Sequence, residues 1–245
     1  MISVCMAAHN GQKYIKQQLE SILIQLSVSD EIVISDDGST DATLDVIKEM
    51  NDARIKVFHY KQPSKTKHPH EYVCGNFENA LIHAKGDFIF LSDQDDEWLP
   101  NKVEVCMNDL KKYDLVLHDF SHMDDDGNIT KELHYNGSFY PKNYFLVHRG
   151  KHYGCAMAFH KKVLQYALPF PNHLMLHDCW IGLLTEALGS FYFEKQTLLK
   201  YRIHQQNTSD TQNSIFFKMS YRANNFLNLV ARVLKYKFKL KSHRI

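Results

Sequence analysis

The segment GDFIFLSDQDDEW, residues 86–98, joins an apolar strand to a cluster of carboxylates. Its run Phe88–Leu91 has the length and composition of a buried strand. Three aspartates and one glutamate follow within six residues of that run. Carboxylates crowded at a strand end repel one another unless a cation offsets their charge. Because Mg²⁺ and Mn²⁺ prefer carboxylate and phosphate oxygens, the segment predicts a divalent-metal site at the end of a strand.

Two other interpretations of the acidic segment differ from a metal and phosphate site. In an EF-hand calcium loop Glu104 would fall at the twelfth position, but Trp98 stands at the sixth, where the sharp turn demands glycine. The EF-hand is therefore rejected. A solvated acidic turn without a ligand stays open on this segment alone, and the rest of the sequence has to decide.

The segments before it alternate between strands and helices. Strand patterns at 2–8, 31–35, 54–60 and 87–91 alternate with helix patterns at about 15–26, 41–50 and 76–85. This alternation is typical of βα units and predicts an α/β fold, with a Rossmann-like, mostly parallel sheet flanked by helices. Ligands of such sheets bind beyond the carboxyl ends of the strands, where the polar residues of this sequence gather.

Composition indicates one ordinary globular domain followed by a basic tail. The chain has 245 residues, of which 44% are hydrophobic and 23% charged. All 28 acidic residues and 21 of the 29 basic ones precede Thr211, so the body carries −7 and residues 211–245 carry +8. The expected domain is therefore 1–210. Nucleic acid is not expected as a partner, because the body is acidic and lacks a recognition motif.

The five cysteines and the first residues indicate the compartment. The cysteines lack CxxC spacing and do not form an even framework, as expected of free thiols in a reducing environment. The chain opens on an apolar strand pattern without the basic leader and long apolar stretch of a secretory signal. We therefore expect a cytoplasmic protein, at the inner face of the cell membrane if the tail binds lipid.

Residues 211–245 have the pattern of a basic amphipathic helix. Apolar side chains fall on one face of that helix, and eight Lys and Arg enrich the rest: the apolar set is Phe216, Met219, Ala223, Phe226, Leu227, Val230, Val233 and Leu234. Such a helix can lie in a membrane interface. It can equally dock on the body and leave a basic end in solvent, and both alternatives stay open.

Three segments together resemble the family-2 glycosyltransferases of the GT-A fold. They are AAHNG at 7–11, EIVISDDGSTD at 31–41 and NFENALIHAKGDFIFLSDQDDEWLPNK at 76–102. Their order and spacing match that family over roughly the first half of the chain. The resemblance implies that 1–120 bind a nucleotide sugar and that 121–210 form the acceptor half.

The same resemblance assigns residues to the donor and the metal. It implies that Asp95 binds the metal, Mn²⁺ or Mg²⁺, and that Asp93 supports the metal or contacts the donor's ribose. Asp37 would hydrogen-bond the uracil or thymine edge, although a carboxylate there also stabilises the start of a helix. Ala7 and His9 occupy the segment that contacts the base, with the imidazole stacking on it. The late segment 201–209 resembles the family motif in which His204 completes the metal site and Arg202 balances the diphosphate charge.

Asp178 is the candidate general base. A hydroxyl nucleophile must lose its proton as it attacks, and a carboxylate within hydrogen-bond reach can accept that proton. Asp178 lies where the family places an acidic base ahead of a helix, and its alternative role is the helix N-cap. The sequence His177-Asp178-x-Trp180 resembles the rhamnosyltransferase-like members, which implies that His177 and Trp180 contact the acceptor.

These expectations combine into one reaction. The chain would move a sugar, with inversion, from dTDP-rhamnose or a UDP-hexose to a hydroxyl of a glycan or lipid-linked oligosaccharide, in the synthesis of a bacterial surface polysaccharide. A sugar nucleotidyltransferase would need a glycine-rich phosphate loop that residues 7–11 do not supply. A non-catalytic protein that binds nucleotide sugars or glycans on the same fold is the remaining alternative.

Overall fold

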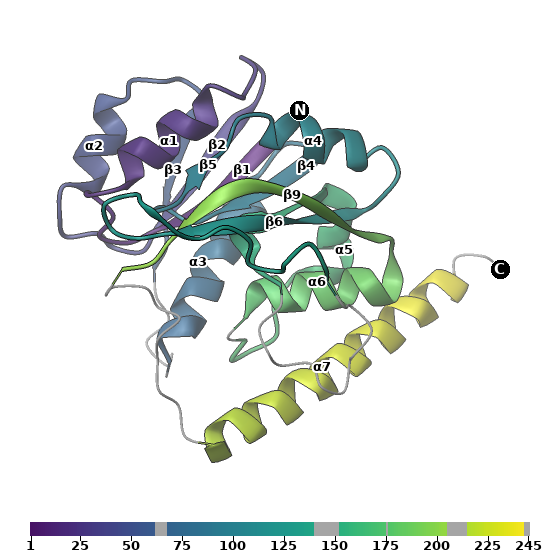
Figure 1. Ribbon diagram of the computed structural model, residues 1–245. Helices are drawn as coiled ribbons and strands as arrows, with labels where there is room; N and C mark the ends of the chain where they lie inside the picture. Colours follow the sequence, from purple (N-terminus) through teal and green to yellow (C-terminus); the bar gives the residue numbers. More distant parts are fainter. Residues whose placement is uncertain (62–67, 140–151, 175, 205–214, 243–245) are drawn as a thin grey trace.

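A computed structural model describes residues 1–61, 68–139, 152–174, 176–204 and 215–242. Its centre is one curved sheet, with strands in the order β3-β2-β1-β4-β8-β6-β9-β5 and β7 paired to β6 (Figure 1). The predicted α/β class and its flanking helices are therefore confirmed.

The first four strands of this sheet are parallel. They are β1 (Ile2–Ala8), β2 (Glu31–Asp36), β3 (Ile55–His59) and β4 (Phe88–Ser92). β1 and β2 are buried along almost their whole length, which explains their continuous apolar runs. Because the strands are parallel, the polar residues that follow them meet at one edge of the sheet.

The second half of the sheet is mixed. β8 (Met157–His160) pairs antiparallel with β4 and with β6 (Leu115–Met123). β9 (Phe191–Arg202) runs parallel to β6, the short β5 (Glu97–Trp98) pairs antiparallel with β9, and β7 (Ile129–Lys131) closes a hairpin with β6. Through β5 and β9, the residues after β4 lie beside the end of β9.

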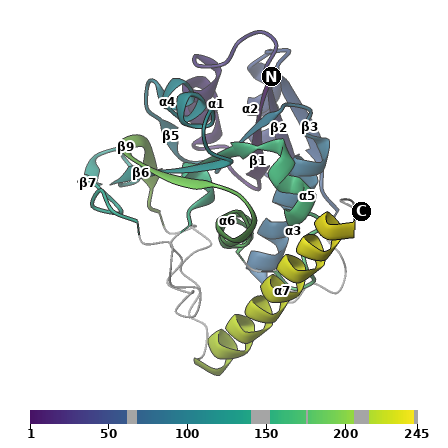
Figure 2. The ribbon, with the colours of Figure 1, turned by 90° about the vertical axis from the view of Figure 1, so that its right-hand side faces the viewer.

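Helices cover both faces of the sheet. Figures 1 and 2 show α1 (Ile15–Leu23), α2 (Thr43–Glu49) and α4 (Lys102–Asp109) on one side and α3 (Pro69–His83) and α6 (His177–Leu188) on the other. The short α5 (Leu164–Ala167) packs against α6, and 3-10 turns at Gly154–Ala156 and Lys161–Val163 flank β8. α3 begins at Pro69, seven residues before its predicted start, because His68 caps it and proline fits its first turn.

The tail forms α7 (Ile215–Ser242), which packs against α6 and α5 as the outermost layer (Figure 2). The apolar residues predicted on one face of this helix are not equally buried. Val233 packs against the core, whereas Leu227 and Leu234 are 67% and 52% exposed. Among the described residues, no helix has the length and hydropathy needed to cross a bilayer.

Candidate active site at the carboxyl ends of the strands

The acidic segment after β4 and the end of β9 meet at the carboxyl edge of the sheet. Asp95 Oδ2 lies 2.8 Å from Nε2 of His204, and both side chains are largely buried. The imidazole of His204 stacks on the ring of Tyr14, with the centroids 5.0 Å apart. Two residues more than 100 positions apart, both expected at the metal, are therefore in direct contact.

A second acidic group lies beside this pair. Asp93, Asp96 and Cys155 place ligand atoms within 4.8 Å of one another. Burial, followed by the charges of Asp95 and Asp178, raises the pKa of Asp93 to about 7. Burial also raises the pKa of Asp96 well above its usual range. Asp93 and Asp96 are thus costly to ionise together, and the Coulomb effect of Asp178 on Asp93 places that residue within reach of the group.

Lys102 supplies part of the counter-charge. Its side chain is fully buried, its Nζ donates to the Cys155 carbonyl over 2.6 Å, and it lies 4.1 Å from the centre of the Trp98 ring. Burial lowers its pKa to about 8. One lysine cannot balance these carboxylates, so the region favours an added cation.

The donor atoms fit a hard divalent cation. Asp95 and His204, in contact with each other, offer a carboxylate oxygen and an imidazole nitrogen, and Asp93 offers a carboxylate oxygen in the neighbouring group with Asp96 and Cys155. Carboxylate oxygens are the ligands that Mn²⁺ and Mg²⁺ prefer. Burial raises the pKa of the Cys155 thiol well above its usual range. The residues present therefore fit the expected Mn²⁺ or Mg²⁺.

Arg202 was expected to balance the charge of the diphosphate, but its guanidinium is hydrogen-bonded to the protein. Only 2% of the residue is exposed, and its guanidinium donates to the carbonyls of Asp95, Asp124 and Asp125 and to Gln17 Oε1 over 2.8–3.3 Å. Its backbone N–H donates to Asp96 Oδ1 over 3.0 Å. These donors are directed at the protein, so Arg202 holds the acidic segment in place and does not present itself to a diphosphate.

The residues expected to contact the nucleobase of the donor lie together at the carboxyl ends of β1 and β2. His9 Nδ1 is 2.9 Å from the Asp37 carbonyl, and the His9 ring is exposed beside the half-buried Asp37. Ala7, which is partly buried, lies at the end of β1 in register with Ser35 of β2. Asp36 fixes this turn by accepting from the backbone N–H groups of Gly38 and Ser39, each over 3.1 Å.

Gln94 links this turn to the acidic segment, although sequence patterns did not identify it. Its side-chain amide accepts from the His9 N–H and donates to the His9 carbonyl, each over 2.9 Å. Gly11 permits this contact, because a Cβ on Gly11 would overlap the Gln94 amide. In the sequence, the glycine at position 11 is the one sign that another group packs closely there, and it does not identify that group as Gln94.

Asp178 lies at the start of α6, facing Gly154. The N-cap of α6 is Leu176, so the expected alternative of Asp178 as N-cap is wrong. Asp178 Oδ1 accepts from the Cys179 N–H over 2.7 Å, and Oδ2 accepts from the Gly154 N–H over 3.3 Å. Each oxygen keeps a free lone pair, which a general base requires.

His177 is buried beside Asp178 with one ring nitrogen unused. Its ring stacks on Phe77 at 4.1 Å, and its Nδ1 lies 3.9 Å from the Cys74 sulfur. Its Nε2 is buried and has no hydrogen-bond partner within the described part of the chain. A Cβ on Gly154 would lie 3.2 Å from that Nε2, which therefore points toward the glycine and the space near Asp178.

Trp180, unlike His177, does not point toward the space near Asp178. Only 3% of the residue is exposed, its indole N–H donates to the Ala167 carbonyl over 2.9 Å, and Arg232 covers its ring at 5.2 Å. It presents almost no surface to an acceptor. Trp180 instead joins α6 to α5 and α7, because its position two residues after Asp178 turns it to another side of the helix.

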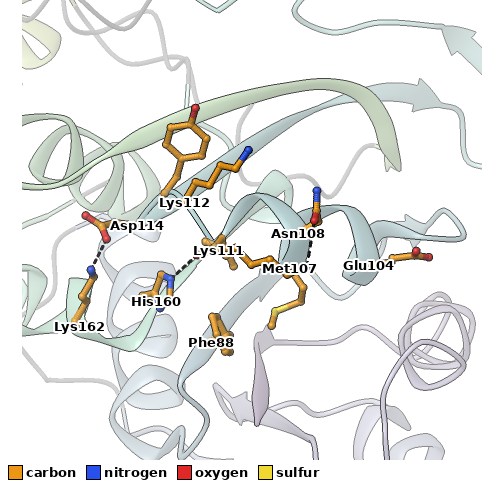
Figure 3. Close-up of a pocket in the computed structure, with 11 residues that line it drawn as sticks. Phe88, Glu104, Met107, Asn108, Lys111, Lys112, Asp114, His160 and Lys162 are labelled. Atoms are coloured by element: carbon orange, nitrogen blue, oxygen red, sulfur yellow. Dashed lines mark hydrogen bonds and ion pairs between the residues drawn. The ribbon is translucent and has the colours of Figure 1, made fainter.

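A groove of about 750 Å³ lies elsewhere (Figure 3). It runs along α4 and is lined by Phe88 at the first residue of β4 and by His160 at the last residue of β8. These positions are at the amino edge of the parallel strands, opposite Asp93. The groove is therefore separate from the cluster of candidate site residues.

Comparison with known proteins agrees with this architecture. The model of the family "Glycosyl transferase family 2" matches residues 3–167. S. aureus TarS 1–349, crystallised with UDP-GlcNAc, superposes with a TM-score of 0.71 at 18% identity, covering 93% of this chain and 66% of that TarS fragment. Glucosyl-3-phosphoglycerate synthase of Mycobacterium tuberculosis, with Mn²⁺, UDP and phosphoglyceric acid, gives 0.56 at 17% identity over 95% and 78% of the two chains. The expected GT-A fold is confirmed.

Sequence relatives are bacterial glycosyltransferases that are longer than this chain. The GalNAc(5)-diNAcBac-PP-undecaprenol beta-1,3-glucosyltransferase of Campylobacter jejuni is 30% identical over 220 residues, which are 84% of this chain and 66% of that protein. An uncharacterised glycosyltransferase of Rickettsia typhi is 26% identical over 229 residues, again 66% of its length. The chain thus spans just under two thirds of these relatives, and the family match over residues 3–167 shows that it belongs to glycosyltransferase family 2.

Proposed function

We propose that this chain transfers a sugar, with inversion, from a UDP or dTDP donor to a hydroxyl of a glycan or lipid-linked oligosaccharide. The observation that carries the proposal is the convergence of Asp93, Asp95 and Asp178, which come from opposite halves of the chain: Asp95 contacts His204, and the charges of Asp95 and Asp178 add to burial in raising the pKa of Asp93. A metal-binding pair next to a separate carboxylate is what a single in-line displacement requires.

Asp178 would act as the base. Gly154 and Cys179 hold its two oxygens through backbone N–H groups, which fixes the carboxylate without neutralising it. As the acceptor oxygen attacks the anomeric carbon, its proton passes to Asp178, and the bond to the departing diphosphate breaks on the opposite face. No covalent sugar–protein intermediate is needed, so the anomeric configuration inverts.

The diphosphate would leave beside Asp95 and His204. A divalent cation held by Asp95, His204 and Asp93 would supply charge neutralisation for the diphosphate. Arg202 contributes indirectly, since its bond to the Asp95 carbonyl fixes the segment that carries this carboxylate.

His9, Asp37 and Ala7 would hold the base of the donor, and His177 would position a sugar hydroxyl. Burial lowers the pKa of His177, so its ring is neutral and Nε2 can form one hydrogen bond with a hydroxyl. The finer choice of a dTDP-rhamnose donor rests on the segment 177–180. UDP-hexoses are supported by the UDP found in TarS and in the synthase of M. tuberculosis.

The acceptor class is inferred from relatives. The C. jejuni relative is a glucosyltransferase that acts on a diphospho-undecaprenol-linked sugar. A glucosyltransferase of E. coli, 30% identical to this chain over 112 residues, acts on the same class of acceptor. We infer a lipid-linked or glycan acceptor for this chain and a role in surface polysaccharide synthesis.

The decisive experiment is a donor panel. Purified protein is mixed with UDP- and dTDP-sugars, Mn²⁺ or Mg²⁺ and short glycan acceptors, and release of nucleoside diphosphate is measured. We expect one donor to react, and Asp95→Ala to abolish its turnover, because the diphosphate then leaves without a metal. The exposed hairpin variant Asp126→Ala is the matched control and should retain activity.

Two other results would count against the proposal. Turnover that is unchanged in Asp95→Ala, or insensitive to removal of divalent metal with a chelator, would remove the metal assignment. Tight donor binding by calorimetry with no turnover for any acceptor would favour a non-catalytic nucleotide-sugar-binding protein instead.

A further inference from the structure

One face of α7 is fixed to the body of the protein. Asn225 and Leu229 are 8% and 7% exposed, and Tyr236 packs edge-on against Tyr166 at 5.4 Å. Arg232 donates to the carbonyls of residues 166–169 over 2.7–3.2 Å and covers the Trp180 ring. These contacts set the rotation of the helix about its axis, so the opposite face has a defined direction.

That opposite face carries an apolar stripe. Leu227, Val230, Leu234 and Phe238 are 67%, 39%, 52% and 69% exposed. Their spacing of three, four and four residues places them on one line along the helix, about half a turn from Asn225 and Leu229. We call these four residues the outer stripe. Docking on the body has left it uncovered by the described part of the chain.

The charges around the outer stripe are all of one sign. Lys235 and Lys237 are exposed beside the outer stripe, and no acidic residue follows Asp210 in the sequence. At 100° per residue, Lys237 falls on one flank of the outer stripe and Lys235 on the other. An apolar line flanked by lysines matches a surface with an apolar interior and anionic groups at its boundary.

We propose that the outer stripe docks on an anionic lipid bilayer, with Leu227, Val230, Leu234 and Phe238 among the acyl chains and the lysines at the headgroups. A second copy of this chain, paired stripe to stripe, is disfavoured because it would bring two sets of lysines together. The inference does not depend on the transfer reaction.

The first turns of α7 lie near the candidate general base. Tyr221, in the first two turns of α7, lies within electrostatic reach of Cys74, Cys179 and Asp178. α7 runs along the outside of α6, whose first turn carries Asp178 (Figures 1 and 2). A bilayer under the outer stripe would bring a lipid-anchored acceptor to the side of the protein that carries Asp178.

Vesicle binding tests the proposal without any turnover. The full chain is sedimented with phosphatidylcholine vesicles and with vesicles in which part of that lipid is replaced by phosphatidylglycerol. We expect binding to the anionic vesicles, weakened by salt. The double variant Lys235→Gln/Lys237→Gln should bind roughly 25-fold more weakly, at about fivefold for each lysine. The control Lys16→Gln/Lys48→Gln makes the same charge change at exposed sites elsewhere and should bind like the parent.

A reporter at the outer stripe tests insertion directly. Both native tryptophans, Trp98 and Trp180, are buried, so Phe238→Trp adds one exposed fluorophore. We expect its emission to shift to the blue with anionic vesicles and to be quenched by brominated acyl chains. Thermal unfolding of each variant checks that the body is intact.

Three outcomes would overturn the proposal. They are absence of binding to anionic vesicles, equal loss of binding in the two lysine double variants, and a Phe238→Trp emission that does not change when lipid is added. Light scattering that shows a dimer which Leu234→Ser/Phe238→Ser makes monomeric would replace the bilayer with a second copy of the chain.

Discussion

Asp178 and His177 are neighbours in the sequence, but their surroundings suit them to different roles. Asp178 is half-buried, and its two oxygens accept backbone N–H groups that fix the carboxylate in position. His177 is buried between Phe77 and Cys74, and burial lowers its pKa, so it stays neutral. One residue is suited to proton transfer and the other to positioning.

Replacing Asp178 should affect the chemical step and not donor binding. Asp178→Asn keeps the shape, and its amide oxygen can still accept the shorter bond from the Cys179 N–H, but the amide nitrogen cannot accept the Gly154 N–H and the amide cannot take a proton. We expect kcat to fall by about 10²–10⁴, with donor affinity by calorimetry within about twofold of the parent. Asp126→Asn on the exposed hairpin is the control. A kcat close to that of the parent would exclude Asp178 as the base.

Replacing His177 should affect substrate binding. His177→Phe keeps the stacking on Phe77 and removes the ring nitrogens. The loss of one neutral hydrogen bond predicts a rise in KM of about tenfold for the substrate that Nε2 contacts, with a smaller change in kcat. His177→Gln restores a polar group and should recover part of the loss. Equal KM values in all three proteins would show that Nε2 touches no substrate.

Two glycines allow close contact between neighbouring strands or the segments that flank them. Gly11 admits the Gln94 amide, which ties the end of β1 to the segment after β4. Gly86, ahead of β4, faces backbone atoms of Met1, Ile2 and Ser3 at 2.6–2.8 Å from where a Cβ would stand. The first glycine adjoins a flexible side chain and the second adjoins fixed backbone.

These two glycines should respond differently to alanine. Gly86→Ala forces two strands apart and should destabilise the protein by about 2 kcal/mol or more, read as a lower midpoint in urea. Gly11→Ala should unfold close to the parent, since Gln94 can rotate away. It should nevertheless bind donor more weakly, because the His9 turn loses its tie to the acidic segment. The opposite ranking in stability would refute this reasoning.

Across the whole molecule, several buried histidines couple stability to pH. Burial lowers the pKa of His118 well below its usual range, and burial together with His122 lowers that of His134 to about 4. Nε2 of His122 lies 2.8 Å from Nδ1 of His134, so the pair cannot hold two charged rings without repulsion. The folded protein keeps these rings neutral, whereas the unfolded chain protonates them near pH 6.5.

The sign of the effect follows from proton uptake. Below about pH 6.5 the unfolded state binds more protons than the folded state, so stability falls as pH drops toward 4. Between about pH 7 and about pH 5, we expect the free energy of unfolding of His134→Gln to fall by about 1 kcal/mol less than that of the parent, after allowance for the partial exposure of His134. Urea unfolding at both pH values measures this. His59→Gln, at a ring 76% exposed, should follow the parent. An equal loss in His134→Gln and the parent would rule out the assignment.

The sequence by itself determined the α/β fold and the positions of the carboxylates. Alternating apolar runs and turn residues act over a few positions, so strands such as β1 and β4 and the polar residues after them follow from local pattern. The contact between Asp95 and His204 agrees with motifs that had indicated both residues as metal ligands. That a metal binds there remains a prediction.

Only the tertiary structure decided which side chains are available to a ligand. Arg202 and Trp180 carried the expected residue types, yet their donors are taken by carbonyls from distant segments. Gln94 gained its role from a glycine 83 positions away, and α7 turned part of its predicted apolar face outward. Burial and hydrogen-bond pairing depend on contacts between remote segments, and no local sequence pattern contains them.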